Sequence, residues 1–253
     1  MNQGNVSLKP YYIDIHTHIL PGLDDGAQDL YDTLEMVEVA ARCGVTAMVA
    51  TPHCADDQTR DVYAAWQFLQ EALQETGIPL TLFPGMEIFG TEDTAKLLRE
   101  GKLLTLNGSH YPLIEFSFHS SGEEESWILS SVCNSGFRPI VAHPERYSYV
   151  QRDPRILNSW LRMGCLLQVN RGSLLGRFGR YAQEMAIELV GRGFATVVAS
   201  DAHSSRVRTT WMEDAWQFLS AEFSPQCARV LLADNPERIL KDEQLTPAEP
   251  EWF

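Results

Sequence analysis

The feature that most constrains this chain is a regular alternation between short apolar runs and longer amphipathic stretches. Runs rich in Val, Ile, Leu and aromatic residues are typical of buried strands. The seven runs are YYIDIH, TAMVATPH, LTLFPGMEI, PLIEFSF, RPIVAH, CLLQVN and ATVVASDAH. Helical spacing of apolar residues separates them at 29–43, 60–75, 91–100, 123–135, 153–163, 181–192 and 209–221.

A strand followed by a helix, repeated seven times, predicts parallel βαβ units and an α/β fold. In one domain of this length, a closed or nearly closed (β/α) barrel is the economical arrangement, and an open doubly wound sheet is the alternative. Asn107-Gly108 is a hairpin signal, which allows one antiparallel strand before the fourth main strand. We expect a single domain over 11–241, with loosely held ends at 1–10 and 242–253.

Composition narrows the class of protein. The net charge of -14 argues against nucleic acid as a partner, because phosphate backbones attract stripes of Lys and Arg. No run approaches the ~18 apolar residues that a membrane span needs, and the first ten residues do not resemble a secretory signal. The five scattered cysteines indicate reduced thiols. We therefore expect a cytoplasmic protein without direct membrane insertion.

Polar residues gather where the apolar runs end. Five of the seven histidines and several acids hold such positions, and the carboxyl ends of barrel strands meet on one face. Singly, each has a simpler explanation: a packed histidine, a helix-capping Asp201, or a turn shaped by Asp24 and Asp25. The residues at or just after strand ends are His16, His18, Asp25, His53, Glu87, Glu115, His143, Asp201 and His203.

Taken together, these side chains predict a metal centre. Burying five histidines and four acids without partners costs several kcal/mol per unpaired charge, and divalent cations neutralise such groups. A mixture of imidazole and carboxylate suits Mn, Fe or Zn in a catalytic site. Nine ligands are too many for one ion, so two or three ions are implied.

The segments DIHTHILPGLDDGA, ATPH, GMEI, LIEF, AHPERY, QVNRGS and SDAH together resemble the PHP (polymerase and histidinol phosphatase) superfamily, over about 11–240. More narrowly, they resemble its manganese-dependent bacterial protein-tyrosine phosphatases of capsular and exopolysaccharide synthesis. This resemblance implies a distorted (β/α)7 TIM-like barrel of the PHP type, with three divalent ions, foremost Mn²⁺, at its C-terminal face. It assigns one ion to His16, His18, Glu87 and Asp201, a second to Glu87, Glu115 and His143, and a third to Asp25, His53 and His203.

The resemblance also implies two arginines on the phosphate. Arg146 of HPER is one, and Arg208 after SDAH is the other, although Arg206 is close enough to compete with it. Cys54, Ser204 and Phe89 depart from the usual family residues without touching an implied ligand. A further basic segment, NRGSLLGRFGR, either lines the substrate channel or forms a solvated turn; its arginines are Arg171, Arg177 and Arg180.

The expected reaction is direct attack of a metal-bridging hydroxide on a phosphoester, without a phosphoenzyme. The three ions would outweigh the charge of four carboxylates, so the site would attract a phosphate dianion. A tyrosyl leaving group, with a pKa of about 10, needs little acid assistance. The resemblance implies a phosphotyrosine protein as partner, namely the C-terminal tail of a bacterial tyrosine kinase. Histidinol phosphate and nucleotide phosphates are alternative substrates.

Three other functions remain as alternatives: a cysteine-dependent phosphatase, an amidohydrolase and a non-enzymatic binding module. HCADDQTR, at 53–60, matches the H-C-x5-R spacing of cysteine-dependent phosphatases, but Asp56 and Asp57 would face the phosphate and the segment has no glycine. An amidohydrolase also begins with HxH, although no lysine stands at a strand end here. A non-enzymatic module would bind metal without hydrolysing any phosphoester.

Overall fold

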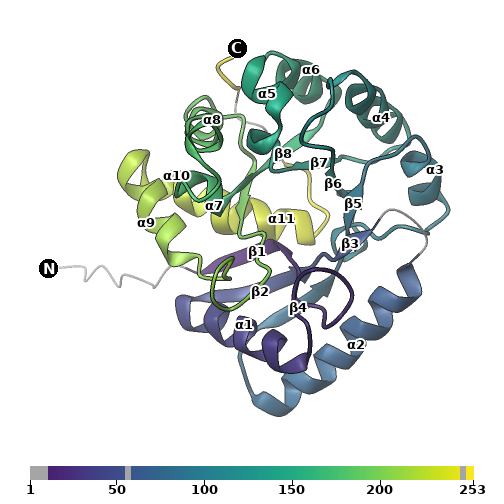
Figure 1. The fold of residues 1–253 in the computed structure, drawn as a ribbon, viewed down its shortest axis with the longest axis vertical. Helices are drawn as coiled ribbons and strands as arrows, with labels where there is room; N and C mark the ends of the chain where they lie inside the picture. The colour runs from purple at the N-terminus through teal and green to yellow at the C-terminus, as the bar shows by residue number, and fades with distance from the viewer. Residues whose placement is uncertain (1–10, 55–57, 246–248) are drawn as a thin grey trace, which may run out of the picture.

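The computed structural model describes residues 11–54, 58–245 and 249–253. Residues 1–10, which we expected to be loosely held, lie outside the described residues, and so do Asp56 and Asp57. Parallel strands occupy the centre of the molecule and helices surround them (Figure 1). The strands are β1 (Tyr12–Thr17), β2 (Val45–Ala50), β3 (His53–Cys54), β4 (Thr81–Pro84), β5 (Glu87–Phe89), β6 (Leu113–Glu115), β7 (Ile140–Ala142), β8 (Leu166–Asn170) and β9 (Val197–Ala199).

The parallel α/β character is confirmed, but a closed seven-stranded barrel is not. The described strands form two sheets, one in the order β1-β2-β4 and the other in the order β3-β5-β6-β7-β8-β9. Every strand pairing within them is parallel. Backbone hydrogen bonds also connect the end of β1 with the segment after β9: Asp201 N donates to His16 O at 3.0 Å, and His18 N to Ala202 O at 2.9 Å.

Two of the seven expected strands are each divided into two. The expected run TAMVATPH, at 46–53, breaks at Pro52, which has no N–H to donate. Pro52 O instead accepts from Glu87 N at 3.1 Å. The run at 81–89 breaks at Gly85, where an added Cβ would lie 2.8 Å from Val49 Cγ1. These breaks start new strands, β3 and β5, at His53 and Glu87, so two polar residues begin strands rather than end them.

Helices follow the strands much as the sequence predicts. In α1, Asp29 caps the N-terminus by accepting from Asp32 N, and Gly44 ends the helix in the left-handed region. The helices are α1 (Leu30–Cys43), α2 (Thr59–Thr76), α3 (Thr94–Arg99), α4 (Glu123–Asn134), α5 (Ser148–Arg152), α6 (Ile156–Met163), α7 (Arg171–Leu174), α8 (Arg180–Gly191), α9 (Glu213–Glu222), α10 (Pro225–Arg229) and α11 (Asn235–Leu240), with short turns η1 (Leu106–Gly108), η2 (Pro144–Arg146) and η3 (Val230–Asp234).

The turn at Asn107-Gly108 is present, but it does not join two antiparallel strands. Asn107 has φ 54°, and Leu106 N donates to Tyr111 O at 3.0 Å. No strand lies between β5 and β6, a stretch that the structure describes throughout. The Asn107 side chain instead donates to Leu240 O at 3.0 Å, so a contact with the far end of the chain replaces strand pairing.

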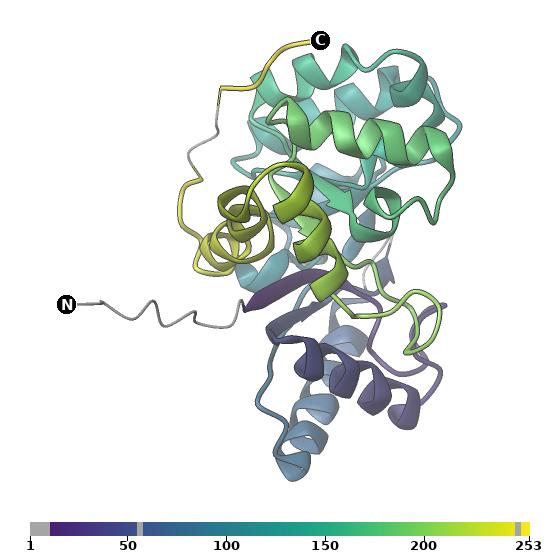
Figure 2. The same cartoon turned by 90° about the vertical axis from the view of Figure 1, so that its left-hand side faces the viewer.

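The last described residues lie against α6 and the end of α8, near the label C in Figures 1 and 2. Asn158 and Phe253 exchange two hydrogen bonds, of 3.2 and 3.3 Å, and Glu251 N donates to Arg192 O at 2.8 Å. Residues 249–253 are therefore attached to the fold rather than loose. Among the described helices, none combines the length and the apolar character required to cross a bilayer.

Candidate metal centre

The polar residues predicted from the strand ends converge on one carboxylate. Glu87 begins β5 and is fully buried. Its Oε2 lies 3.1 Å from His16 Nε2, 3.2 Å from His18 Nε2 and 3.0 Å from His53 Nδ1. Its Oε1 lies 2.9 Å from His143 Nε2. Four imidazoles from three separate strands thus surround one acid.

His16 and His18 form the deepest part of this cluster. Both side chains point to the same face because residues two apart on a strand share a side, and their Nε2 atoms are 3.2 Å apart. Asp201 Oδ1 lies 3.6 Å from the first Nε2 and 3.5 Å from the second. These four residues, Glu87 included, are the set that the resemblance assigns to one ion.

The remaining predicted ligands lie toward the outer part of the cluster. His53 Nδ1 is 2.8 Å from Glu115 Oε1, and His53 Nε2 is 3.5 Å from Asp25 Oδ1. Asp25 Oδ1 also lies 3.3 Å from His203 Nε2. All nine predicted residues therefore occupy one continuous cluster. His53 contacts both Glu115 and Asp25, so it stands between the second and third predicted sets rather than within the third alone.

Three groups in this cluster have the composition and spacing of metal ligands. Within each group the candidate ligand atoms lie within 4.8 Å of one another. Imidazole nitrogen and carboxylate oxygen are the donors that Mn, Fe and Zn accept. The groups are His16, His18 and Glu87; His53, Glu87 and Glu115; and His18, Asp25, His53 and His203.

Outer contacts orient the two inner histidines. His16 Nδ1 lies 3.0 Å from Gln168 Oε1, and His18 Nδ1 lies 2.7 Å from Asp24 Oδ2. Because these oxygens accept from Nδ1–H, Nε2 is the atom of each ring that faces Glu87 and that a cation would bind in place of a proton. From the sequence, Asp24 was expected only to shape a turn, and Gln168 was not expected at the site. The signal for Gln168 was its place in QVN, a polar residue inside a buried strand.

Buried carboxylates set the protonation of the histidines. Burial opposes charge on His16 and His18, but Glu87 and Asp201 outweigh it and raise the pKa of both imidazoles. Burial likewise opposes charge on His53, yet its contacts with carboxylates raise its pKa to about 10. The acids thus draw positive charge into the cluster in the form of protons.

The same balance applies to the acids. Burial favours the neutral form of Glu87 and Asp201, but the neighbouring histidines lower the pKa of both carboxyl groups. Asp24 behaves in the same way, since its contact with His18 overcomes burial and lowers its pKa to about 2. Carboxylates that stay ionised while buried need cations nearby. Divalent ions meet that need and displace the imidazole protons, so the donor set fits a metal centre.

Two of the six candidate arginines reach this cluster. Arg146 Nη1 lies 3.2 Å from Asp201 Oδ2, and Arg208 Nη2 lies 2.5 Å from the same oxygen. Arg206 is exposed, and its electrostatic neighbours are Tyr31 and Glu35 on the α1 side. Of the two arginines that follow SDAH, Arg208 is therefore the one beside the cluster.

The three arginines of NRGSLLGRFGR have different contacts. Arg171 is buried and forms a two-pronged pair with Asp214, with distances of 2.6 and 2.5 Å. Arg180 is exposed and pairs with Glu184 one turn along α8. Both arginines therefore pair with acids outside the nine-residue cluster. Arg177 donates to Val207 O at 3.1 Å and so connects its loop to the one that carries Arg208.

Polar contacts also connect the loops around Arg146. Asn170 Nδ2 donates to Asp201 Oδ2 at 2.5 Å. Glu145 is fully buried and accepts from Asn170 N at 2.9 Å and from Ser173 Oγ at 2.6 Å. Asn170 and Glu145 were not predicted site residues, although they lie in the segments QVNRGS and AHPERY that carry the family resemblance. Their contacts fix the ends of β7 and β8 relative to one another.

Two residues of the cluster have an uncommon backbone conformation. His143 has φ 38° and Asp201 has φ 52°, in the left-handed region that non-glycine residues rarely enter. Such conformations cost about 1–3 kcal/mol each and occur often at functional sites. At both residues the bend turns the side chain toward Glu87 or His16, so the conformation positions the donors.

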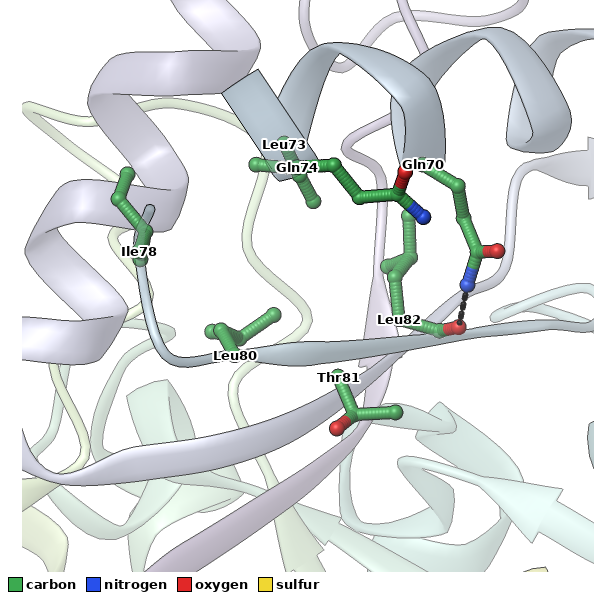
Figure 3. Close-up of a pocket in the computed structure, with 7 residues that line it drawn as sticks. All are labelled: Gln70, Leu73, Gln74, Ile78, Leu80, Thr81 and Leu82. Carbon is green, nitrogen blue, oxygen red and sulfur yellow. Dashed lines mark hydrogen bonds between the residues drawn. The ribbon is translucent and has the colours of Figure 1, made fainter. Parts of the chain in front are cut away.

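A hollow elsewhere on the molecule shows no comparable chemistry. It measures about 200 Å³ and lies between α2 and β4, where Leu73, Ile78, Leu80 and Leu82 surround it (Figure 3). Gln70 Nε2 donates to Leu82 O at 2.9 Å along one side. Its lining contains no charged residue, histidine or cysteine, and we assign it no role in catalysis.

Known proteins resemble this chain over nearly its whole length. A family model for capsular polysaccharide synthesis proteins, CpsB/CapC, matches residues 12–241. The tyrosine-protein phosphatase YwqE of Bacillus subtilis is 33% identical over 243 residues, which cover 94% of this chain and 95% of the relative. The tyrosine-protein phosphatase CpsB of Streptococcus pneumoniae is 31% identical over 240 residues, with coverage of 91% and 99%.

A solved structure agrees with these relatives. It comes from crystal structures of YwqE and CpsB, described as unique metal-dependent tyrosine phosphatases. It superposes on this chain with a TM-score of 0.89 at 32% identity, and covers 95% of this chain and 99% of its own.

Proposed function

Because this chain belongs to the CpsB/CapC family of capsular polysaccharide synthesis, we propose that it is a metal-dependent protein-tyrosine phosphatase. The observation that carries this proposal is the Glu87 carboxylate, which contacts four imidazoles at 2.9–3.2 Å beside two converging arginines. Such a cluster can hold cations and an anionic substrate together. Histidinol phosphate is less favoured, because the relatives that match nearly the whole chain are tyrosine phosphatases.

We propose that three divalent ions, foremost Mn²⁺, occupy the cluster. Bound there, they would supply Lewis acidity, which lowers the pKa of water and offsets the charge of a phosphoryl group. Gln168 and Asp24 keep the inner imidazoles in the tautomer that offers Nε2 to a cation. The proposed ligands are those of the resemblance, namely His16, His18, Asp25, His53, Glu87, Glu115, His143, Asp201 and His203.

The two arginines are proposed to bind the phosphoryl group. Arg146 follows β7 and Arg208 follows β9, with β8 between the two strands, and both already donate to one carboxylate oxygen, at 3.2 and 2.5 Å. A phosphoryl oxygen is a similar anionic acceptor, and guanidinium groups bind such oxygens with paired N–H donors. Charge on these oxygens changes as the phosphoryl group transfers, so donors already in place stabilise the transition state.

Several broader features belong to the same proposal. The two sheets, joined through His16 and Asp201, would form the distorted seven-stranded barrel that the resemblance implies. The partner would be the tyrosine-bearing C-terminal tail of a bacterial kinase. All five cysteines are thiols without disulfides, which suits a reducing compartment, and we propose that the protein acts in the cytoplasm.

Substrate preference tests the proposed function directly. We expect the Mn²⁺-supplemented protein to hydrolyse a phosphotyrosine peptide with a kcat/KM at least about tenfold above that for histidinol phosphate or a nucleoside monophosphate. The reason is the leaving group: a phenol, with a pKa of about 10, departs without acid help, unlike an alkyl alcohol. Phosphate release assays on the three substrates measure this ratio. Faster release from histidinol phosphate would support the alternative instead.

Cys54 distinguishes this mechanism from a cysteine-dependent one. It follows His53 on β3, so its side chain points away from the cluster, and it packs in the hydrophobic core. We expect Cys54→Ser to keep turnover within about twofold of wild type, since a buried hydroxyl perturbs packing without touching the cluster. Measurement of kcat on the phosphotyrosine peptide decides this. Loss of turnover in a folded, metal-loaded Ser variant would favour the thiolate mechanism.

A further inference from the structure

Four side chains near the metal cluster alternate between aromatic rings and guanidinium groups. Arg146 Cζ lies 4.7 Å from the centre of the Phe118 ring and 4.2 Å from the centre of the Phe178 ring. Arg208 Cζ lies 5.8 Å from the centre of the Phe178 ring. The four residues follow β6, β7, β8 and β9 in turn, so they span four neighbouring strand ends. Phe178 is the member that contacts both arginines.

The loop that carries Phe178 fixes its position. Gly176 and Gly179, with φ 74° and 89°, flank a tight turn that few other residues could form. The Phe178 ring packs directly on Gly172, where an added Cβ would lie 2.5 Å from Phe178 Cε2. Arg177 then ties the turn to the loop of Arg208 through Val207 O. The ring is thus held by backbone geometry rather than by the arginines alone.

Stacking on a ring has a specific consequence for a guanidinium group. The face of the ring attracts the cation but accepts no in-plane hydrogen bond, so the N–H donors stay available at the edge of the guanidinium plane. Each arginine already pairs with Asp201 Oδ2 through one nitrogen, and the ring occupies none of the N–H donors that remain. A ring that contacts two arginines therefore restrains both cations and leaves those remaining donors for an anion.

We propose that Phe178 is a positioning residue that holds Arg146 and Arg208 as one clamp for the phosphoryl group. This proposal rests on the proposed function. Phe178 touches neither the substrate nor the metal ligands in the proposed reaction; it acts through the two arginines. Phe118 contacts Arg146, and among the described residues no such contact joins it to Arg208, so its contribution should be smaller.

Replacement of the ring tests the proposal. Phe178→Leu keeps an apolar side chain against Gly172 but removes the aromatic face. We expect kcat/KM for a phosphotyrosine peptide to fall about tenfold, and the dissociation constant of inorganic phosphate, measured by calorimetry on the Mn²⁺-loaded protein, to rise by about the same factor. Phe178→Tyr keeps the ring and should stay within about twofold of wild type. Metal content should be unchanged in both variants.

A double-mutant cycle separates positioning from mere packing. In an Arg146→Lys background, whose ammonium cannot stack as a plane, Phe178→Leu should have an effect of only about two- to threefold. Phe68→Leu, an exposed position on α2, is the matched control and should change neither quantity.

Wild-type phosphate affinity in Phe178→Leu, or an undiminished effect in the Arg146→Lys background, would overturn the inference. A wild-type protein that binds phosphate but hydrolyses no phosphotyrosine would count against the proposed function, while the phosphate affinities of the variants would still decide the role of Phe178.

Discussion

Exhaustive removal of metal should lower turnover of a phosphotyrosine peptide at least about 10³-fold, and added Mn²⁺ should restore it. Without ions, Glu87 and Asp201 have only neighbouring imidazoles and arginines as counter-charges, and nothing lowers the pKa of water. A loss of several kcal/mol of transition-state stabilisation corresponds to that factor. Elemental analysis before and after chelation, together with phosphate release, measures the effect.

The metal-free protein must remain folded for this result to bear on mechanism. We expect circular dichroism to show retained secondary structure and thermal unfolding to shift to lower temperature, because ions that bind only the folded state stabilise it by mass action. Comparing Mn²⁺, Fe²⁺ and Zn²⁺ at equal occupancy would show which ion restores the highest turnover. A preparation that stays fully active with no detectable metal would refute the mechanism proposed above.

Glu87→Gln should have a similarly large effect, a loss of at least about 10³-fold in kcat. The amide keeps the shape of the side chain but removes the charge that contacts His16, His18, His53 and His143. The shared carboxylate lies in two of the three candidate ligand groups, so its loss weakens two sites at once. Metal stoichiometry should fall together with activity.

A purely structural role for Glu87 predicts a different outcome. If it only neutralised buried imidazoles, Glu87→Gln would lower the unfolding temperature and leave metal content and kcat close to wild type. Glu184→Gln offers a matched control, because this exposed residue pairs with Arg180 on α8 far from the cluster. We expect that variant to match wild type in both metal content and turnover.

The sequence was most informative about what the strand ends bring together. His16 and Asp201 are far apart in the chain, yet parallel strands place their carboxyl ends on one face, so their proximity followed from the βαβ pattern. Glu87 reaches the same cluster although it begins β5. The helix boundaries followed from caps such as Asp29 and Gly44. These are local signals, and they need no knowledge of distant contacts.

Other features depend on contacts that a linear pattern does not contain. The division of two strands depends on how Pro52 and Gly85 meet neighbouring strands, and the turn at Asn107 is bound by Leu240 rather than by a partner strand. Arg171 and Arg208 both stand in segments that follow strands, and the sequence does not show what each one contacts. Only the tertiary structure shows that Arg171 pairs with Asp214, whereas Arg208 pairs with Asp201 in the cluster.

At His143 and Asp201, the left-handed backbone lowers the stability of the fold, while the side chains are the ones that the proposed metal site needs. Glycine or asparagine fits that conformation more comfortably, yet neither supplies an imidazole or a carboxylate. If selection acted only on the stability of the fold, these two side chains would be expected to be replaced early. Relatives that keep the fold but carry Gly or Asn at both positions are therefore expected to be catalytically inactive and to unfold at a higher temperature.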